Sequence, residues 1–340
     1  MKRTRTNWTK KATILLAAVC VALAAAAAFT PPGAQEWLLQ VEGAPVSRAV
    51  YSYFLAQAIR DAKQAGRLKA DGSPKDLAAL RKDVTARCVE YIAIGSTLRE
   101  MEVPVDQVLK SQVADQTASY WRVFGRYYKS IGVSKQTLSA VLTGQAARDQ
   151  LFRALYDAGG TKGTAEETIE SYFYGNYLAY EGIRVFRKVM EEDGTEREMD
   201  ISEAAALRQT LQDFVQEAND SEDFYGAAQE EKFAEALSYG TPTVTWMRTG
   251  TAEFSEEDFK LLRALKPSEV VLLSLPGYFL VARGINMRES PEEHYLRYRA
   301  DCLWKLKGAL FEKELKAICG AYRADENVGA MEKFYGEWKW

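Results

Sequence analysis

The chain has a single histidine, His294, among 340 residues. One imidazole cannot build a His-rich zinc site, an HExxH metalloprotease motif or a facial-triad iron site. Nine prolines and 23 glycines exclude collagen-like and Pro-rich low-complexity classes. The sequence also lacks a phosphate-binding G-x-x-x-x-G-K-[ST] loop and a G-x-S-x-G nucleophile elbow. We therefore expect neither a metal site nor a cofactor.

The body of the protein lacks a basic surplus. The net charge is −3, yet residues 1–11 contain five basic residues and no acid, so the remainder is more acidic than the net value. Nucleic-acid binding requires a surplus of Lys and Arg on the folded part to neutralise phosphates. Nucleic acid is excluded as a partner on this ground.

Cysteine is scarce as well. Cys20 lies within an apolar run, where lipidation of its thiol is an alternative. A lipoprotein site needs a small residue directly before the cysteine, and Val19 stands there instead. The other three cysteines, Cys88, Cys302 and Cys319, are odd in number and cannot form a complete disulfide framework. We expect buried thiols, with Cys302 and Cys319 the better pair if the helix between them is broken.

The N-terminus has the pattern of an export signal. Residues 12–29 form an 18-residue run in which Thr13 is the polar member, directly after the basic cluster. A helix of this length reaches ~27 Å, enough to cross a hydrocarbon core. Residues 1–29 are predicted to be an uncleaved signal anchor or a cleaved signal peptide, and residues 30–36 a linker. Everything beyond the run is then extracytoplasmic.

Residues 37–178 are predicted to form a helical domain. Apolar residues recur at helical spacing, and Ser47, Asp106 and Ser134 stand where N-caps are expected. A short strand and turn precede the first helix. The predicted helices cover residues 47–65, 73–101, 106–132, 134–158 and 164–176, the last opened by a capping box at 164–167.

Residues 179–288 change to strand patterning. Apolar and polar residues alternate from Ile183, and two apolar runs at 270–275 and 278–283 flank Pro276-Gly277 as a hairpin. Helices are expected at 202–219, 224–237 and 255–265, with a strand at 244–247. The pattern predicts a four-stranded antiparallel sheet with helices. The overall fold class is α+β, mostly α.

Three strings resemble SurA/PrsA-type extracytoplasmic chaperones. VEGAPVS at 41–47 resembles that family's opening strand and turn, GVSKQTL at 132–138 its entry into a long helix, and TAEETIESYF at 164–173 the helix before its isomerase domain. Two further strings, LKPSEV at 265–270 and PGYFLV at 276–281, resemble parvulin-type prolyl isomerases. The resemblance implies a parvulin-like domain inserted into a helical chaperone domain.

The parvulin resemblance lacks its polar core. Gly182 and Phe279 stand where the family has histidines, and Thr243 stands where it has Cys or Asp. The domain is therefore expected to be degenerate, with no catalytic residue assigned. The residues expected to contact a bound peptide are Trp246, Met247, Phe259, Tyr278 and Phe279, with a place in the core as the alternative for Trp246 and Phe279.

Residues 289–340 are predicted to return to the helical domain. Ser290 is the expected cap of a long helix to about residue 318, in which His294 is expected to be solvent-exposed. The aromatic tail 330–340 is expected to dock into the protein's own groove rather than to be presented to a partner.

The function that these features favour is a membrane-anchored foldase or chaperone outside the cytoplasm. Its partners would be unfolded or newly exported polypeptides, and residues 12–29 would contact the membrane. Two alternatives stay open: an active peptidyl-prolyl cis-trans isomerase of parvulin type, and a structural cell-envelope protein. The sequence leaves enzymatic activity undecided.

Overall fold

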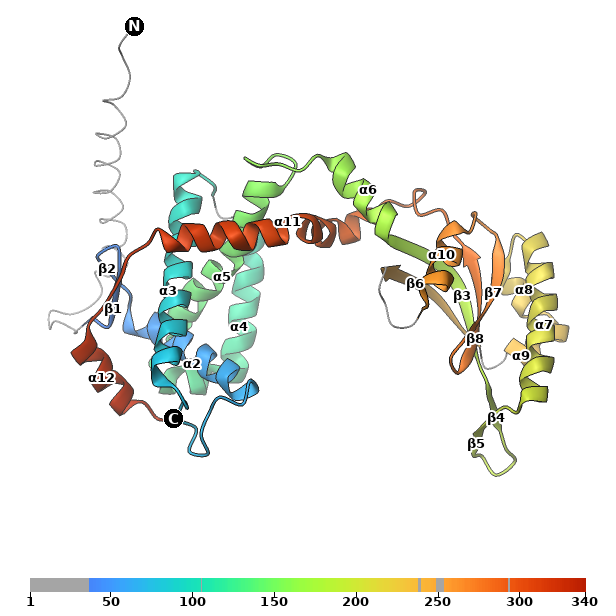
Figure 1. The fold of residues 1–340 in the computed structure, drawn as a ribbon, viewed down its shortest axis with the longest axis horizontal. Helices are drawn as coiled ribbons and strands as arrows, with labels where there is room; N and C mark the ends of the chain where they lie inside the picture. The colour runs from blue at the N-terminus through green and yellow to red at the C-terminus, as the bar shows by residue number, and fades with distance from the viewer. Residues whose placement is uncertain (1–36, 105, 238–239, 249–253, 293) are drawn as a thin grey trace, which may run out of the picture. The chain divides into compact units, whose positions relative to one another are not determined.

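A computed structural model describes residues 37–104, 106–237, 240–248, 254–292 and 294–340, without the side chains of residues 235 and 240–248. The chain folds into two compact units (Figure 1): Met1–Gly163 with Lys307–Trp340, and Thr164–Leu306. The predicted membrane segment and linker, residues 1–36, lie outside the described residues. Within the described part, no helix combines the length and apolarity needed to cross a membrane.

The helical unit is built from a bundle and a small sheet. The elements wholly within it are β1 (Leu39–Val41), β2 (Ala44–Pro45), α2 (Arg48–Gln64), α3 (Leu77–Glu100), α4 (Gln107–Ser130), α5 (Lys135–Tyr156), β9 (Ala324–Glu326) and α12 (Val328–Glu337). Ser47, Asp106 and Ser134 accept hydrogen bonds from the first turns of α2, α4 and α5, as predicted. The long helix α11 (Tyr295–Gly320) begins in the other unit and ends in this one.

Both ends of the helical unit meet in its small sheet. β1 pairs antiparallel with β2 through a two-residue turn, Glu42 and Gly43, at φ 51° and 74°. Such a turn needs positive φ at both positions, which glycine adopts without a steric penalty. β1 also pairs antiparallel with β9, so that residues more than 280 positions apart share one ladder.

The aromatic tail docks into its own unit, as expected. Helix α12 buries Ala330, Met331, Phe334 and Tyr335 in the main core of the helical bundle. Phe334 meets Tyr51 of α2 edge to face, with ring centroids 5.5 Å apart. Fully burying side chains of this size stabilises a fold by ~1.5–3 kcal/mol each. The C-terminus therefore completes the bundle rather than extending from it.

The second unit is built around a sheet. Its elements are α6 (Glu166–Asn176), β3 (Tyr177–Phe186), β4 (Lys188–Met190), β5 (Glu196–Glu198), α7 (Ile201–Asp220), α8 (Phe224–Ala228), α9 (Glu231–Leu237), β6 (Gly240–Arg248), α10 (Glu256–Ala264), β7 (Val270–Leu275) and β8 (Tyr278–Gly284). Four strands pair antiparallel in the order β6-β3-β8-β7, and β4 and β5 form a separate ribbon.

The sheet has a core on each face. Side chains alternate across a strand, so neighbouring residues of β3 and β8 belong to different cores. Ile183, Val185, Phe279 and Val281 pack with α7, α8 and α9. Leu178, Tyr180, Leu280 and Ala282 pack with α10. Figure 1 shows α7 and α8 along one side of this sheet.

Three local predictions are wrong. Helix α11 begins at Tyr295, not at the predicted cap Ser290. His294 is 7% exposed rather than solvent-exposed, and its Nδ1 lies 2.9 Å from the Met287 carbonyl oxygen. No capping box opens α6: its cap is Ala165, which makes no side-chain bond. Thr164 precedes that cap and is 4% exposed. Glu166, in the first turn of α6, forms a bidentate ion pair with Arg299 at 2.5 and 2.7 Å.

The expectation of buried thiols is confirmed for two of the three described cysteines. Cys88 and Cys302 are buried, Cys319 is half-buried, and no disulfide joins the three. Burial raises the pKa of the Cys88 thiol. The helix between Cys302 and Cys319 is unbroken, which keeps this pair apart. Cys20 lies outside the described residues.

Candidate functional site

Helix α4 carries an apolar stripe on its solvent-facing side. The helix packs on α5 through a narrow seam in which Val113, Thr117 and Gly125 are buried. The stripe consists of residues at i, i+3, i+4 and i+7, which lie on one face of a helix. Its members are Tyr120 at 37% exposure, Val123 at 64%, Phe124 at 49% and Tyr127 at 50%.

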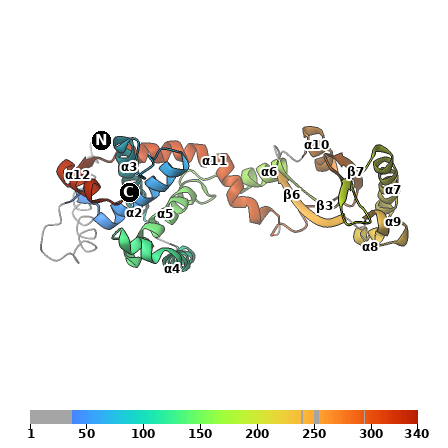
Figure 2. The ribbon, with the colours of Figure 1, turned by 90° about the horizontal axis from the view of Figure 1, so that it is seen from below.

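This stripe places apolar side chains on the side of the helix that faces solvent. An amphipathic helix normally turns its apolar face to the core, and a contiguous exposed apolar patch marks an interaction site. Tyr120 and Phe124 contact edge to face at 6.4 Å, so the members form a patch rather than scattered residues. An open hollow of about 560 Å³ lies beside them, lined by Arg122, Val123, Phe124, Arg126, Tyr127 and Ser130. In Figure 2, α4 lies at the edge of the helical unit.

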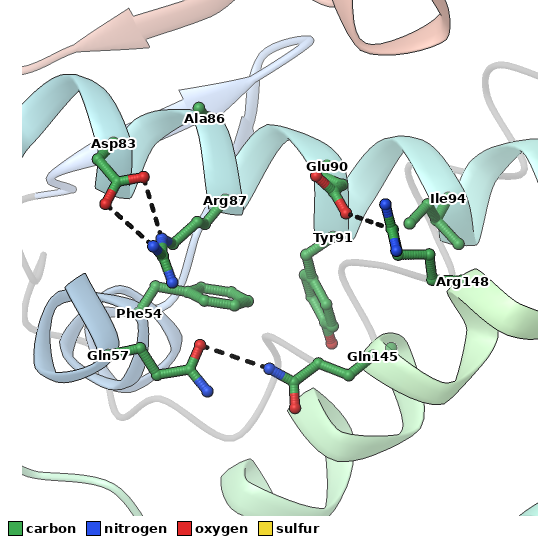
Figure 3. A pocket seen from close by; sticks show the side chains of 11 residues that line it. Phe54, Gln57, Asp83, Ala86, Arg87, Glu90, Tyr91, Ile94, Gln145 and Arg148 are labelled. Carbon is green, nitrogen blue, oxygen red and sulfur yellow. Dashed lines mark hydrogen bonds and ion pairs between the residues drawn. The ribbon is translucent and has the colours of Figure 1, made fainter. Parts of the chain in front are cut away.

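A second feature is a pocket of about 530 Å³ between α2, α3 and α5 (Figure 3). Phe54, Tyr91 and Ile94 give it apolar walls. Two amide side chains face each other across it, with Gln145 Nε2 donating to Gln57 Oε1 at 3.4 Å. Amides both donate and accept hydrogen bonds, so this pair suits the peptide groups of an extended chain.

The charges around the pocket are already paired. The Arg87 guanidinium donates to Asp61 at 2.9 Å and to Asp83 at 3.1 Å. Arg148 lies 3.2 Å from Glu90 on one side and 2.5 Å from Glu312 on the other. The two arginines face four carboxylates, so these ion pairs leave no unpaired cation for a ligand. The pocket is thus suited to an uncharged side chain or a peptide group.

Close approach of α3 and α5 fixes the pocket wall. A Cβ placed on Gly144 would lie 2.2 Å from the Tyr91 ring, far inside van der Waals contact. Glycine at this position of α5 leaves the space that the Tyr91 ring occupies. Tyr91 in turn packs on Phe54 with ring centroids 5.9 Å apart.

Aromatic rings connect the pocket wall with α4. Phe54 contacts Tyr53 at 5.6 Å, Tyr53 stacks on Tyr128 at 6.1 Å, and Tyr128 contacts Tyr127 of the stripe at 5.9 Å. Burial raises the pKa of Tyr53 to about 12. The pocket and the stripe therefore share one cluster of rings within the helical unit.

The three positions expected to replace a parvulin polar core do not form a cluster. Gly182 pairs with Thr243 in the β3–β6 ladder. A Cβ on Gly182 would lie 2.9 Å from the Tyr180 ring and 3.0 Å from Leu280, on the α10 face. Phe279 belongs to the opposite face, in the core with α7, α8 and α9. The alternation of strand side chains separates Phe279 from Gly182, whereas Gly182 and Thr243 are direct neighbours on adjacent strands.

The expected peptide-binding residues do not form one groove either. Phe279 is 3% exposed and Phe259 is 7% exposed, in different cores on opposite faces of the sheet. Tyr278 is half-buried against the α10 core. Trp246 and Met247 lie in β6, paired with Ala179 and Leu178, and their side chains are outside the described part. Phe259 and Phe279 are both core residues of the sheet unit.

The α4 stripe was not predicted, although the helix was. Its signal is present in the spacing of Tyr120, Val123, Phe124 and Tyr127. The same spacing predicts a buried face in most helices, so the sequence cannot tell an exposed stripe from a core seam. Within the described residues, no group of three or more His, Cys, Asp or Glu side chains is placed to hold a metal ion.

Comparison with known proteins adds a distant structural likeness. No family model matches the sequence, and no curated protein matches it significantly. Among solved structures, the foldase protein PrsA from Streptococcus pneumoniae strain Canada MDR_19A is similar to 71% of this chain over 82% of its own length. The identity is 14% and the TM-score 0.33. A likeness this distant carries no argument about activity.

Proposed function

We propose that the protein is a chaperone that binds unfolded polypeptides on the apolar stripe of α4. The observation that carries this proposal is the exposure of Tyr120, Val123, Phe124 and Tyr127, between 37% and 64%, on one helix face. Binding of varied unfolded chains needs adaptable apolar surface rather than a fixed set of catalytic groups. The neighbouring pocket with Gln57 and Gln145 supplies hydrogen-bonding groups for main chain.

The stripe favours weak, reversible contacts. Fully burying one large apolar side chain contributes ~1.5–3 kcal/mol, and these are about half exposed, so each offers roughly 1 kcal/mol to a client. Association costs consume part of that sum. A single segment would bind weakly, while a chain with several apolar segments gains by repeated engagement.

We further propose that the protein acts outside the cytoplasm, held by residues 12–29. The basic cluster before this apolar run supports the orientation. The chaperone would then receive newly exported chains. This part rests on the sequence.

Isomerase activity is proposed to be absent or nearly so. Gly182 and Phe279 lie on opposite faces of the sheet, and the Tyr180 ring lies where a side chain at position 182 would be. His294 is buried against the Met287 carbonyl. General acid–base help contributes ~10²–10⁴-fold, and no such group is assembled among the described residues of this sheet.

The proposal is tested by suppression of aggregation of guanidinium-denatured citrate synthase, followed by light scattering. The test variant combines Val123→Ser, Phe124→Ser and Tyr127→Ser. The matched control combines Met190→Ser, Ile201→Ser and Leu310→Ser, which are 47%, 90% and 52% exposed but lie on three separate elements. We expect the test variant to lose most of the suppression and the control to keep it.

Three results would count against the proposal or one of its parts. Wild-type protein that fails to suppress aggregation would favour a structural envelope role. Equal activity of the test variant and wild type would remove α4 from the binding surface. Rapid isomerisation of a short X-Pro peptide on the same sample would favour the isomerase alternative.

A further inference from the structure

The stretch of sequence that contains the stripe carries charges of one sign only, and they are positive. From Gln116 to Arg148 the sequence contains no Asp or Glu and five basic residues, although the whole chain has a net charge of −3. The five are Arg122, Arg126, Lys129, Lys135 and Arg148. Arg148 is paired with Glu90 and Glu312 in the pocket, so the charges to be explained are those on α4 itself.

Two of these charges border the stripe. Arg122 and Arg126 are exposed and line the same hollow as Val123, Phe124 and Tyr127. Neither has a carboxylate within ion-pair distance among the described residues, in contrast to Arg87 and the other arginines of the pocket.

A third basic side chain acts from the neighbouring helix. Arg60 of α2 opposes the burial effect that raises the pKa of Tyr127. Asp61, the acid beside it, is 3.7 Å from Arg60 but is also bound to Arg87 at 2.9 Å. Arg60 therefore adds to the positive charge of Arg122 and Arg126 at the Tyr127 end of the stripe.

We propose that the stripe selects polypeptide segments in which apolar residues are flanked by Asp or Glu. This inference rests on the proposed function and names the chemical class of its clients. Apolar contact holds the segment on Val123, Phe124 and Tyr127, while Arg122 and Arg126 pair with the flanking carboxylates. An exposed ion pair changes an affinity by up to about fivefold, and like charges oppose binding similarly.

The dimensions favour a polypeptide segment over a lipid surface. The stripe spans residues 120–127, two helical turns or ~10 Å. The preceding turns of α4 expose polar residues such as Gln112, Asp115 and Gln116. A helix that lies in a membrane interface carries its apolar face along most of its length. One short extended segment fits this patch better.

The test compares three fluorescein-labelled peptides with one apolar core, Leu-Phe-Val-Leu, flanked on both sides by two Asp, two Ser or two Lys. Anisotropy with the purified full chain measures each affinity. We expect the Asp peptide to bind about fivefold tighter than the Ser peptide, from two ion pairs of about 0.5 kcal/mol each, and the Lys peptide to bind weakest. The differences should shrink in 0.5 M NaCl, where exposed charges are screened.

A charge-reversed protein sharpens the test. Arg122→Glu with Arg126→Glu should reverse the order of the three peptides. The matched control, Lys313→Glu with Lys316→Glu, reverses two exposed charges on α11 and should preserve the order of the three peptides.

Equal affinities for all three peptides would overturn the charge selection and leave the proposed function intact. Absence of binding to any peptide would overturn both. Binding to phosphatidylglycerol vesicles without peptide binding would assign the patch to a membrane surface instead.

Discussion

The hydroxyl oxygens of Tyr51 and Tyr335 lie 2.7 Å apart inside the helical unit, although 284 positions separate the two residues in the chain. Tyr51 is fully buried, and Tyr335 is 5% exposed. The Tyr51 hydroxyl also contacts the Met331 sulfur at 3.4 Å. This contact joins α12 to α2 within the core of the helical unit, to which α4 also belongs.

Tyr335→Phe is expected to destabilise the protein by about 1–2 kcal/mol. The change leaves a buried hydroxyl of Tyr51 without its oxygen partner and alters little else. Urea unfolding with a helical signal measures it. The control is Tyr322→Phe, whose hydroxyl makes no hydrogen bond among the described residues and should change stability by less than ~0.5 kcal/mol. Equal effects of the two changes would show that the hydrogen bond is not stabilising.

The same pair predicts how stability depends on alkaline pH. Burial raises the pKa of Tyr335 to about 12 and raises that of Tyr51 as well, whereas an unfolded tyrosine titrates near ~10. Above ~10 the unfolded chain loses these protons first, so stability is constant below pH 10 and falls as the pH rises toward 12. Each such group steepens the fall by about 1.4 kcal/mol per pH unit. The slope for Tyr335→Phe should be smaller; a slope identical to wild type would contradict the assignment.

Phe279→Ala is expected to destabilise the sheet unit by about 3–5 kcal/mol. The ring is 3% exposed in the core with α7, α8 and α9, so truncation leaves a cavity. Thermal unfolding measures the change, and Phe186→Ala, at 43% exposure, is the milder control. Binding of denatured citrate synthase should persist at a temperature where Phe279→Ala is folded. Full stability together with loss of client binding would return Phe279 to a binding groove.

Two helix glycines are expected to respond in opposite directions to alanine. Gly144→Ala forces the Tyr91 ring out of place, which costs about 1–3 kcal/mol and distorts the pocket. Gly95→Ala has open space around its Cβ and should stabilise by about 0.5–1 kcal/mol through higher helix propensity. Denaturant unfolding of both variants makes the comparison. A stabilised Gly144→Ala would mean that Tyr91 moves freely and does not define the pocket.

Local signals in the sequence predicted much of the helical unit. The caps Ser47 and Ser134 each accept a hydrogen bond from the backbone three positions away, so their effect can be predicted from neighbouring residues. The same reasoning failed at Thr164 and at Ser290. The cap of α6 is Ala165, one residue after Thr164, and α11 begins at Tyr295, five residues after Ser290.

Burial and long-range pairing could not be derived in this way. The pairing of β1 with β9 depends on loop closure over most of the chain. In the sheet unit, the alternating pattern from Ile183 predicted a strand. The expectation that Gly182, Thr243 and Phe279 lie together came instead from the parvulin resemblance. One residue of strand offset changes the face, which is why Gly182 and Phe279 lie apart. The exposure of Phe124 could not be predicted from the sequence either. Periodicity shows which residues share one face of a helix, but not whether another element covers that face.

The most direct measurement is site-specific photo-crosslinking of the protein to fluorescent, guanidinium-denatured citrate synthase. The photoreactive amino acid p-benzoylphenylalanine replaces Phe124 in the stripe, Tyr278 in the sheet unit or Ile201 as an exposed control. The account predicts a crosslinked product from position 124 several-fold more abundant than from either other position, competed by excess unlabelled client. Product from position 278 that equals or exceeds that from position 124 would contradict it and place the client on the sheet.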